Sequence, residues 1–295
     1  MNRSKEVILP LLQWYGSNRR DLPWRRTMQP YRILVSEVML QQTQVDRVIV
    51  KYRSFLSQFP SVKRLAEASP ADVITAWEGL GYNRRALYLQ KAAVMIRSIF
   101  SGRFPKEEEA LKMLPGVGDY TSRAILSFAF DRPVALLDTN HRKFYARIFG
   151  YEMGGSDRKL LEQTKEVVGE ILEIPSIFSD GRSMVYHWNQ ALMDFGATFL
   201  VRGADFNTCP IKNFDKKFPE VVLSLRKKKK SVPFRETDRY YRGRIVDLLR
   251  KKRQIYLADV RVICADIPLL RQKKIIEGLL GDGLIKKDGY SIILP

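Results

Sequence analysis

A short turn between two apolar helical runs constrains the fold of this chain more than any other feature. The turn lies within residues 114–121 and contains the pattern Pro-Gly-Val-Gly. Such a turn gathers backbone N–H groups at the start of a helix, where they bind a phosphate regardless of base sequence. Asp138 follows soon afterwards. A carboxylate near bound DNA is unfavourable unless it stabilises a developing positive charge, so the pair indicates an enzyme that acts on DNA.

The charge balance agrees with a polyanionic partner. The chain has 51 Lys and Arg residues against 32 Asp and Glu residues, a formal net charge of +19. Charge alone does not separate nucleic acid from an anionic membrane surface. However, no apolar run reaches the length of a membrane span, and the apolar segment 7–12 is too short for a signal peptide. We therefore expect a cytoplasmic, nucleoid-associated protein with no membrane partner.

Apolar spacing predicts a mostly helical domain over residues 1–220. The whole chain of 295 residues is 45% hydrophobic and can bury a sizeable core. Apolar residues recur with helical period, and Pro and Gly separate the periodic stretches. These stretches cover residues 33–50, 71–79, 85–99, 120–130 and 184–199.

A basic segment separates this domain from a shorter C-terminal one. Residues 221–237 include four consecutive lysines and predict a linker, either a solvated tether or a strap that follows phosphates. Residues 238–295 contain two amphipathic stretches, 239–252 and 269–280, and then two short apolar runs around an Asp-Gly pair typical of a β-hairpin. This order resembles a winged helix, a small α+β module.

In a winged helix the second amphipathic stretch would enter a DNA groove. The candidate DNA contacts on it are Arg271, Lys273 and Lys274. The alternative is that these cations form the solvated face of a helix that only packs against its neighbours.

Glu37 is the candidate general acid. It lies in the segment Ser-Glu-Val-Met-Leu-Gln-Gln-Thr, among apolar residues that should desolvate the carboxylate and raise its pKa. An acid of that kind can hold a proton near neutral pH and deliver it to a leaving group. Taken alone, a helical Glu is more often a salt-bridge partner. Its occurrence with the glycine turn and Asp138 favours the catalytic role.

Residues from about 21 to 209 resemble the helix-hairpin-helix DNA glycosylases of the endonuclease III superfamily, and specifically the MutY-type adenine DNA glycosylases. The resemblance implies a fold of two helical lobes and a monofunctional enzyme of base excision repair. Such an enzyme hydrolyses the N-glycosidic bond of adenine mispaired with 8-oxoguanine or guanine. Six ordered motifs carry the match, at residues 22–25, 36–45, 79–82, 114–121, 137–140 and 189–197.

The resemblance also implies catalytic roles. Glu37 would protonate the flipped adenine and later activate water, and Asp138 would stabilise the oxocarbenium-like sugar. Bifunctional relatives place a Schiff-base lysine where this chain has Tyr120, so we expect no lyase step. Asn140 is grouped with these residues, although it could simply cap a helix.

Base flipping needs a wedge and a fitted pocket. By resemblance Trp24, Arg25 and Asp194 belong to the adenine pocket. The alternative for Trp24, and for the wedge residue Tyr82, is an ordinary aromatic residue of the core. The expected DNA contacts are Gln42, Thr43, Leu80 and Tyr82 near the partner base and wedge, and Gly116, Val117, Gly118 and Thr121 at the hairpin.

The chain departs from the family pattern in three places. Most relatives hold a four-iron cluster with four cysteines just after the segment matching 189–197, but only Cys209 and Cys264 are present here. We expect a clusterless member without cofactor or metal, with packing by Phe199, Leu200 and Phe206 in place of the cluster. Asp119 should weaken phosphate contact at the hairpin. The tail is too short for the Nudix-like domain of typical relatives.

These features leave three functions open. The first is the adenine DNA glycosylase, whose expected partner is double-stranded DNA with a mispaired adenine, bound by a monomer. The alternative enzyme is a mismatch thymine or uracil DNA glycosylase, against which the Gln41-Gln42 pair and the 189–191 segment favour adenine. The non-enzymatic alternative is a DNA-binding regulator of glycosylase fold, which the retention of Glu37 and Asp138 disfavours.

Overall fold

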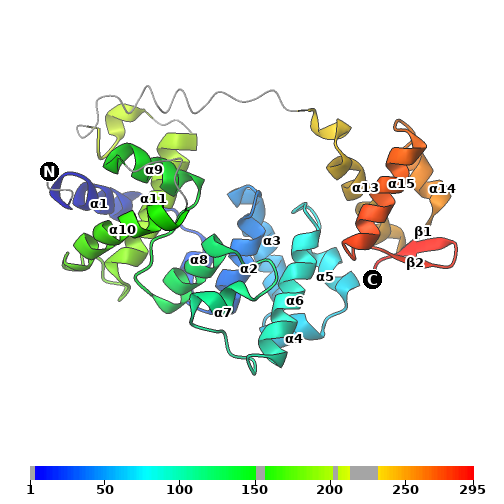
Figure 1. Cartoon of the computed structure of the whole chain (residues 1–295), viewed down its shortest axis with the longest axis horizontal. Helices are drawn as coiled ribbons and strands as arrows, with labels where there is room; N and C mark the ends of the chain where they lie inside the picture. The colour runs from blue at the N-terminus through cyan, green and yellow to red at the C-terminus, as the bar shows by residue number, and fades with distance from the viewer. Residues whose placement is uncertain (1–3, 151–156, 202–204, 213–231) are drawn as a thin grey trace. The chain divides into compact units, whose positions relative to one another are not determined.

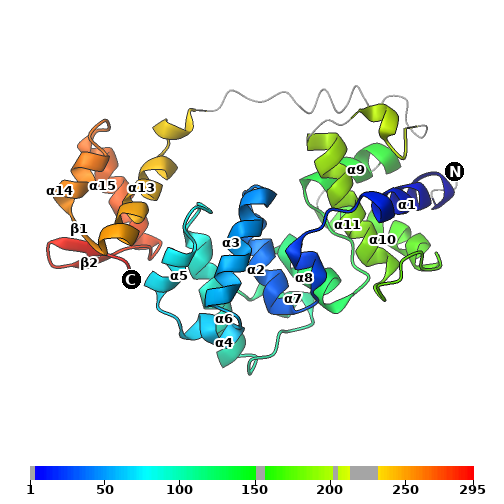
Figure 2. The same ribbon diagram turned by 180° about the vertical axis from the view of Figure 1, so that it is seen from behind.

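The computed structural model describes residues 4–150, 157–201, 205–212 and 232–295. The chain forms two compact units, Met1–Pro30 with Gly118–Lys229, and Tyr31–Val117 with Lys230–Pro295. Figures 1 and 2 follow the elements of both along the chain. Each described unit is mostly helical, as predicted. No helix in the described ranges is both long and apolar enough to cross a membrane.

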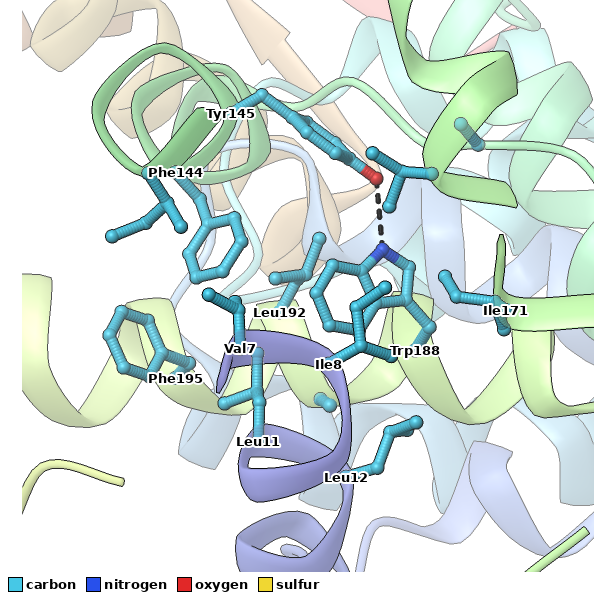
Figure 3. Packing of buried hydrophobic residues seen from close by; sticks show 14 of the residues in the cluster. Val7, Ile8, Leu11, Leu12, Phe144, Tyr145, Ile171, Trp188, Leu192 and Phe195 are labelled. Atoms are coloured by element: carbon cyan, nitrogen blue, oxygen red, sulfur yellow. Dashed lines mark hydrogen bonds between the residues drawn. The ribbon is translucent and has the colours of Figure 1, made fainter. Parts of the chain in front are cut away.

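The first unit packs its helices around aromatic side chains. Figure 3 shows α1 against Trp188, whose indole N–H donates to the Tyr145 hydroxyl at 2.9 Å. Phe144 and Phe195 stack edge to face beside them, with 5.4 Å between ring centroids. Buried aromatic rings of this size supply much of the hydrophobic stabilisation. The elements are η1 (Ser4–Ile8), α1 (Leu9–Asn18), η2 (Pro23–Arg26), α8 (Asp119–Phe130), α9 (Thr139–Phe149), α10 (Asp157–Leu172), α11 (Met184–Phe195), η3 (Gly196–Val201) and η4 (Phe206–Thr208).

Side-chain caps fix two helix starts in this unit. The Asp138 carboxylate accepts the His141 backbone N–H at the start of α9, and the Ser183 hydroxyl accepts the Tyr186 N–H at the start of α11. The Ser183 hydroxyl in turn donates to Asp131, which ends α8 in the left-handed conformation. Each cap satisfies a backbone donor that the helix itself leaves unpaired.

The second unit joins the helices of residues 31–117 to the C-terminal module. The helical part consists of α2 (Pro30–Leu40), α3 (Val45–Gln58), α4 (Val62–Glu67), α5 (Pro70–Ala76), α6 (Arg84–Ser98) and α7 (Glu108–Lys112). The C-terminal module consists of η5 (Phe234–Glu236), α13 (Asp238–Lys252), β1 (Gln254–Tyr256), α14 (Leu257–Ile263), α15 (Leu269–Gly281), β2 (Lys286–Asp288) and β3 (Ser291–Ile293).

The C-terminal module has the order of a winged helix. Its three antiparallel strands pair in the order β1-β3-β2, with Ile255 opposite Ile292 and Lys287 opposite the same residue on the other side. The predicted hairpin is confirmed, and Gly289 at its tip takes a positive φ of 56°. The two predicted amphipathic helices are confirmed as α13 and α15.

The module packs directly on α5 and α6. Ile74 and Leu87 belong to the same buried apolar cluster as Ile245 and Leu249 of α13. The Arg250 guanidinium donates to the Ile74 carbonyl and to the Asn83 side chain, both at 2.9 Å. The C-terminal module is therefore part of the second unit's core.

The structure differs from the periodicity analysis at residues 33–50. These form two helices, α2 and α3, because the chain turns between Gln41 and Gln44 with Gln42 at a φ of 56°. The domain limits 1–220, 221–237 and 238–295 stay predictions. Most of the predicted linker lies outside the described residues, and its last part contains η5.

Candidate active site

Glu37 lies in the buried middle of α2. Its side chain belongs to a run of buried residues from Ile33 to Met39, and Glu37 itself is 5% exposed. A carboxyl group in such surroundings is poorly solvated, so the groups around it decide its protonation state. The predicted burial of Glu37 is confirmed.

The Arg85 guanidinium forms hydrogen bonds to the end of α2, to the loop after it and to the loop before α6. One terminal nitrogen donates to the carbonyls of Val38, Met39 and Gln41 at 2.7, 3.0 and 2.6 Å. The other donates to the Thr43 hydroxyl at 3.0 Å and to the carbonyls of Leu80 and Gly81 at 3.0 and 3.1 Å. Burial lowers the pKa of Arg85 to about 10, so the guanidinium stays charged at neutral pH.

The sequence analysis missed Arg85. The only local signal was an arginine that falls on the apolar face of helix 84–98, where a cation needs internal acceptors. Its acceptors are five backbone carbonyls and the Thr43 hydroxyl, at the end of α2 and in two loops, and no spacing in the sequence identifies such a set.

Both loops joined by Arg85 carry unusual backbone. Gln42 and Tyr82 take positive φ values of 56° and 44°, and Gly79 and Gly81, just before Tyr82, take 81° and 70°. A non-glycine residue in this region costs free energy and persists only when its surroundings hold it there. Gln42 and Tyr82 are exposed, whereas Leu80 is buried at 3% exposure and Thr43 is partly buried. DNA contact by these four residues stays a prediction.

The glycine turn between α7 and α8 depends on its first glycine. Gly116 has a φ of 82°, and a Cβ there would lie 3.0 Å from Cβ of Tyr88. Gly118 precedes α8, and its carbonyl accepts the Ser122 N–H at 2.9 Å. Gly116 and Gly118 are exposed, while Val117 and Thr121 are buried. The turn therefore presents main chain rather than large side chains, as a phosphate contact requires.

Asp138 is held by a buried histidine three residues further along α9. Its Oδ1 atom lies 2.6 Å from Nδ1 of His141 and accepts the His141 backbone N–H at 2.7 Å. His141 is fully buried, and its Nε2 atom has no hydrogen-bond partner among the described residues. Burial opposes the charge on Asp138, but the charge and hydrogen bonds of His141 outweigh it and lower the pKa of Asp138.

This arrangement keeps Asp138 ionised and fixed in direction. Its side chain is 32% exposed, so one edge of the carboxylate remains accessible. An oriented anion of this kind can stabilise a neighbouring cation. The sequence analysis did not single out His141, although a histidine three residues after a capping aspartate could have marked it.

Asn140 does not cap α9, because Asp138 does. Asn140 instead packs tightly on Gly196, where an added Cβ would lie 2.8 Å from Cβ of Asn140. Asn189 forms hydrogen bonds to the segment before Asp138, donating to the Val134 carbonyl at 2.8 Å and accepting the Leu136 N–H at 3.3 Å.

Tyr120 is partly buried on the first turn of α8. Catalytic roles for Tyr120 and Asn140 stay predictions.

Trp24, Arg25 and Asp194 lie within the first unit. Arg25 donates to both carboxylate oxygens of Asp194, at 2.8 and 2.9 Å, and the Arg20 backbone N–H donates to Asp194 at 3.0 Å. Burial opposes the charge on Asp194, but Arg25 outweighs it and lowers the pKa of Asp194. Trp24 is 6% exposed. The bidentate pair is a rigid support, and contact of these residues with adenine stays a prediction.

On α15 the three predicted groove-contacting residues differ in surroundings. Arg271 donates to Asp238 at 2.7 Å and to the Glu236 carbonyl at 2.6 Å, so its guanidinium is engaged within the module. Lys273 and Lys274 are exposed. DNA contact by Arg271, Lys273 and Lys274 stays a prediction.

The two cysteines lie in different units. Both Cys209 and Cys264 are buried, and burial raises the pKa of Cys209 to about 11, which keeps its thiol protonated. Within the described ranges, no three His, Cys, Asp or Glu side chains gather as metal ligands would. Residues 202–204, shortly before Cys209, lie outside the described residues.

The described fold is that of the helix-hairpin-helix DNA glycosylases. A thermostable thymine-DNA glycosylase matches with a TM-score of 0.63 and 24% identity, and an endonuclease III–DNA covalent intermediate with 0.60 and 16%. Each match covers 74% of this chain and 97% of the other. At these identities the likeness shows the shared fold.

Comparison of sequences identifies the family. Residues 35–170 match the HhH-GPD superfamily of base excision DNA repair proteins. The chain is 34% identical over 283 residues to the adenine DNA glycosylase of Mycolicibacterium smegmatis, covering 94% of this chain and 92% of the relative. It is 34% identical to the human adenine DNA glycosylase over 69% of this chain and 38% of the relative. The chain belongs to the adenine DNA glycosylase family of base excision repair enzymes.

Proposed function

We propose that the protein is a monofunctional DNA glycosylase that hydrolyses the N-glycosidic bond of adenine mispaired with 8-oxoguanine or guanine. The observation that carries the proposal is the pair of carboxyl groups in opposed surroundings. Glu37 is buried among apolar residues, whereas Asp138 is partly exposed and kept ionised by His141. Glycosidic chemistry needs one group that donates a proton and one that remains an anion.

Each carboxyl group has a defined step. Glu37 donates its proton to the adenine, so the base leaves as a neutral molecule and the glycosidic electrons go with it. Asp138 faces the positive charge that then develops on the sugar. Glu37, now ionised, accepts a proton from the water that attacks the sugar. Tyr120 offers no amine for a Schiff base, so the product is an intact abasic site.

The proposal includes function without an iron–sulfur cluster. A four-iron cluster of the family type takes four thiolates, and the chain has two cysteines. Near Cys209, the side chain of Phe199 is 3% exposed and packs in the apolar cluster that also contains Cys209. Apolar packing of this kind is consistent with stability that needs no metal.

The test compares substrates under single-turnover conditions. Duplexes place A opposite 8-oxoguanine, A opposite G, and T or U opposite G, and alkali then cleaves any abasic site. We expect strand cleavage only for the two duplexes with mispaired adenine, and only after alkali. Release of T or U instead of A would replace the proposal by mismatch thymine or uracil glycosylase activity. A covalent adduct trapped by borohydride would contradict the monofunctional assignment.

A further inference from the structure

A cavity of about 870 Å³ lies inside the second unit, between the two strained loops and the C-terminal module. We call it the α13 groove. Gln42 and Tyr82, which are both exposed and have positive φ, line one side of it, and α13 lines the other. Its volume is in the range of pockets that hold small ligands, so it suits a short part of one strand and not an intact duplex.

The α13 groove carries uncompensated positive charge. Seven arginines and two aspartates line it. Four of the arginines are already engaged, with Arg84 and Arg242 on Asp282, Arg250 on Asp247, and Arg85 on backbone carbonyls. Arg47, Arg239 and Arg244 have no carboxylate partner among the described residues. The lining arginines therefore outnumber the lining aspartates by five, and the groove favours an anionic ligand.

Aromatic rings lie beside two of these three arginines, Arg239 and Arg244. The Arg239 guanidinium is 4.8 Å from the ring centroid of Tyr82 and 4.9 Å from that of Phe234, and it also donates to the Tyr82 hydroxyl. Arg244 lies 5.6 Å from the ring of Tyr240. Alternating arginines and aromatic faces match a nucleic acid strand, whose phosphates pair with the cations and whose bases stack on the rings.

We propose that the α13 groove binds a short segment of one DNA strand, with phosphates on Arg47, Arg239 and Arg244. The proposal rests on the proposed function, since it takes the substrate duplex as the source of that strand. Because Arg239 of α13 contacts Tyr82, the C-terminal module would bind the DNA next to the loop that contains Tyr82. The module's cations thus act beside the site where the duplex is opened.

The first experiment measures binding in a Glu37→Gln background with a labelled duplex containing A opposite 8-oxoguanine. The test variant is Arg239→Gln with Arg244→Gln. The matched control is Lys251→Gln with Arg261→Gln, which removes the same charge from exposed positions of the module outside the groove. Circular dichroism and thermal melting check that both variants fold.

We expect the groove variant to weaken binding about tenfold or more and to reduce the slope of log affinity against log salt by about two, one for each lost phosphate contact. The control pair should leave that slope unchanged, and Arg239→Lys with Arg244→Lys should retain most of it. Equal effects of the groove and control pairs, or no effect of the groove pair, would overturn the proposal.

The second experiment locates the strand directly. Photo-cross-linking with 5-iododeoxyuridine, placed at successive positions of each strand, should label a peptide containing Tyr82, Phe234 or Tyr240. Cross-links confined to the α15 peptide with Lys273 and Lys274 would contradict the proposal. Both readouts use binding alone, so they remain decisive even if the substrate panel shows that the wild-type protein releases no adenine.

Discussion

At the scale of single residues, the contact with His141 fixes the direction of the Asp138 carboxylate and lowers its pKa. The 2.6 Å separation of Oδ1 and Nδ1 links a partly exposed carboxylate to a fully buried imidazole. Because this contact lowers the folded-state pKa of Asp138, the stabilisation it gives is present above the unfolded-state value near 3.8. It is lost as the pH falls through the folded-state value.

Replacing His141 tests this coupling. In His141→Val the carboxylate loses its side-chain partner but keeps the backbone cap, so we expect the pKa of Asp138 to rise and single-turnover excision to slow by about tenfold. Carboxyl ¹³C NMR titration and excision rates across pH measure the two effects. His141→Asn, whose amide can donate to the carboxylate but carries no charge, should restore most of the rate and only part of the pKa shift. Wild-type titration and rate in His141→Val would refute a positioning role.

At the scale of elements, Arg85 joins the loop after α2 to the loop before α6. Six acceptors, at the end of α2 and in the two loops, bind one guanidinium. This network holds Gln42 and Tyr82 in backbone conformations that neither residue favours alone. The geometry of the predicted DNA-contacting loops thus depends on a residue that itself is buried.

Removing the Arg85 guanidinium should destabilise the protein strongly. Arg85→Met leaves buried carbonyls without donors, and we expect a loss of about 3–5 kcal/mol in the free energy of unfolding. Urea denaturation measures it. Arg84→Met, which removes an exposed arginine beside it on α6, is the control and should change stability by about 1 kcal/mol or less. Similar stability of both variants would contradict the proposed role of Arg85.

The sequence predicts some of these elements well and others poorly, for physical reasons. The hairpin around Gly289 and helices α13 and α15 follow from local turn chemistry and apolar period, which act over a few residues. The break at Gln42 does not, because tertiary contacts from Arg85 hold it. Likewise Glu37 and Asp138 stand out by motif, whereas His141 and Arg85 act through contacts that only the folded chain creates.

At the scale of the whole molecule, the C-terminal module is a structural part of the second unit. Ile74 and Leu87 are buried with residues of α13, and Arg250 bonds to the Ile74 carbonyl. Removal of the module would expose this apolar surface. Point variants in the α13 groove therefore separate DNA binding from folding better than truncation does.

The whole molecule should also fold without iron. With two buried cysteines in different units, we expect purified protein to be colourless and iron-free by elemental analysis, because the thiolates for a family cluster are too few. Treatment with a chelator should leave its melting temperature unchanged. Stoichiometric iron with a visible charge-transfer absorption would show that the clusterless assignment is wrong.

The central claim is that Glu37 supplies the proton for adenine release while Asp138 stabilises the resulting sugar cation. The most direct measurement is single-turnover adenine release from a duplex with A opposite 8-oxoguanine, together with the affinity for that duplex. We predict that Glu37→Gln binds like wild type but excises at least about a hundredfold more slowly, because the amide keeps the shape and cannot give up the proton. Asp138→Asn should be impaired similarly. Near-wild-type excision by Glu37→Gln would contradict the account.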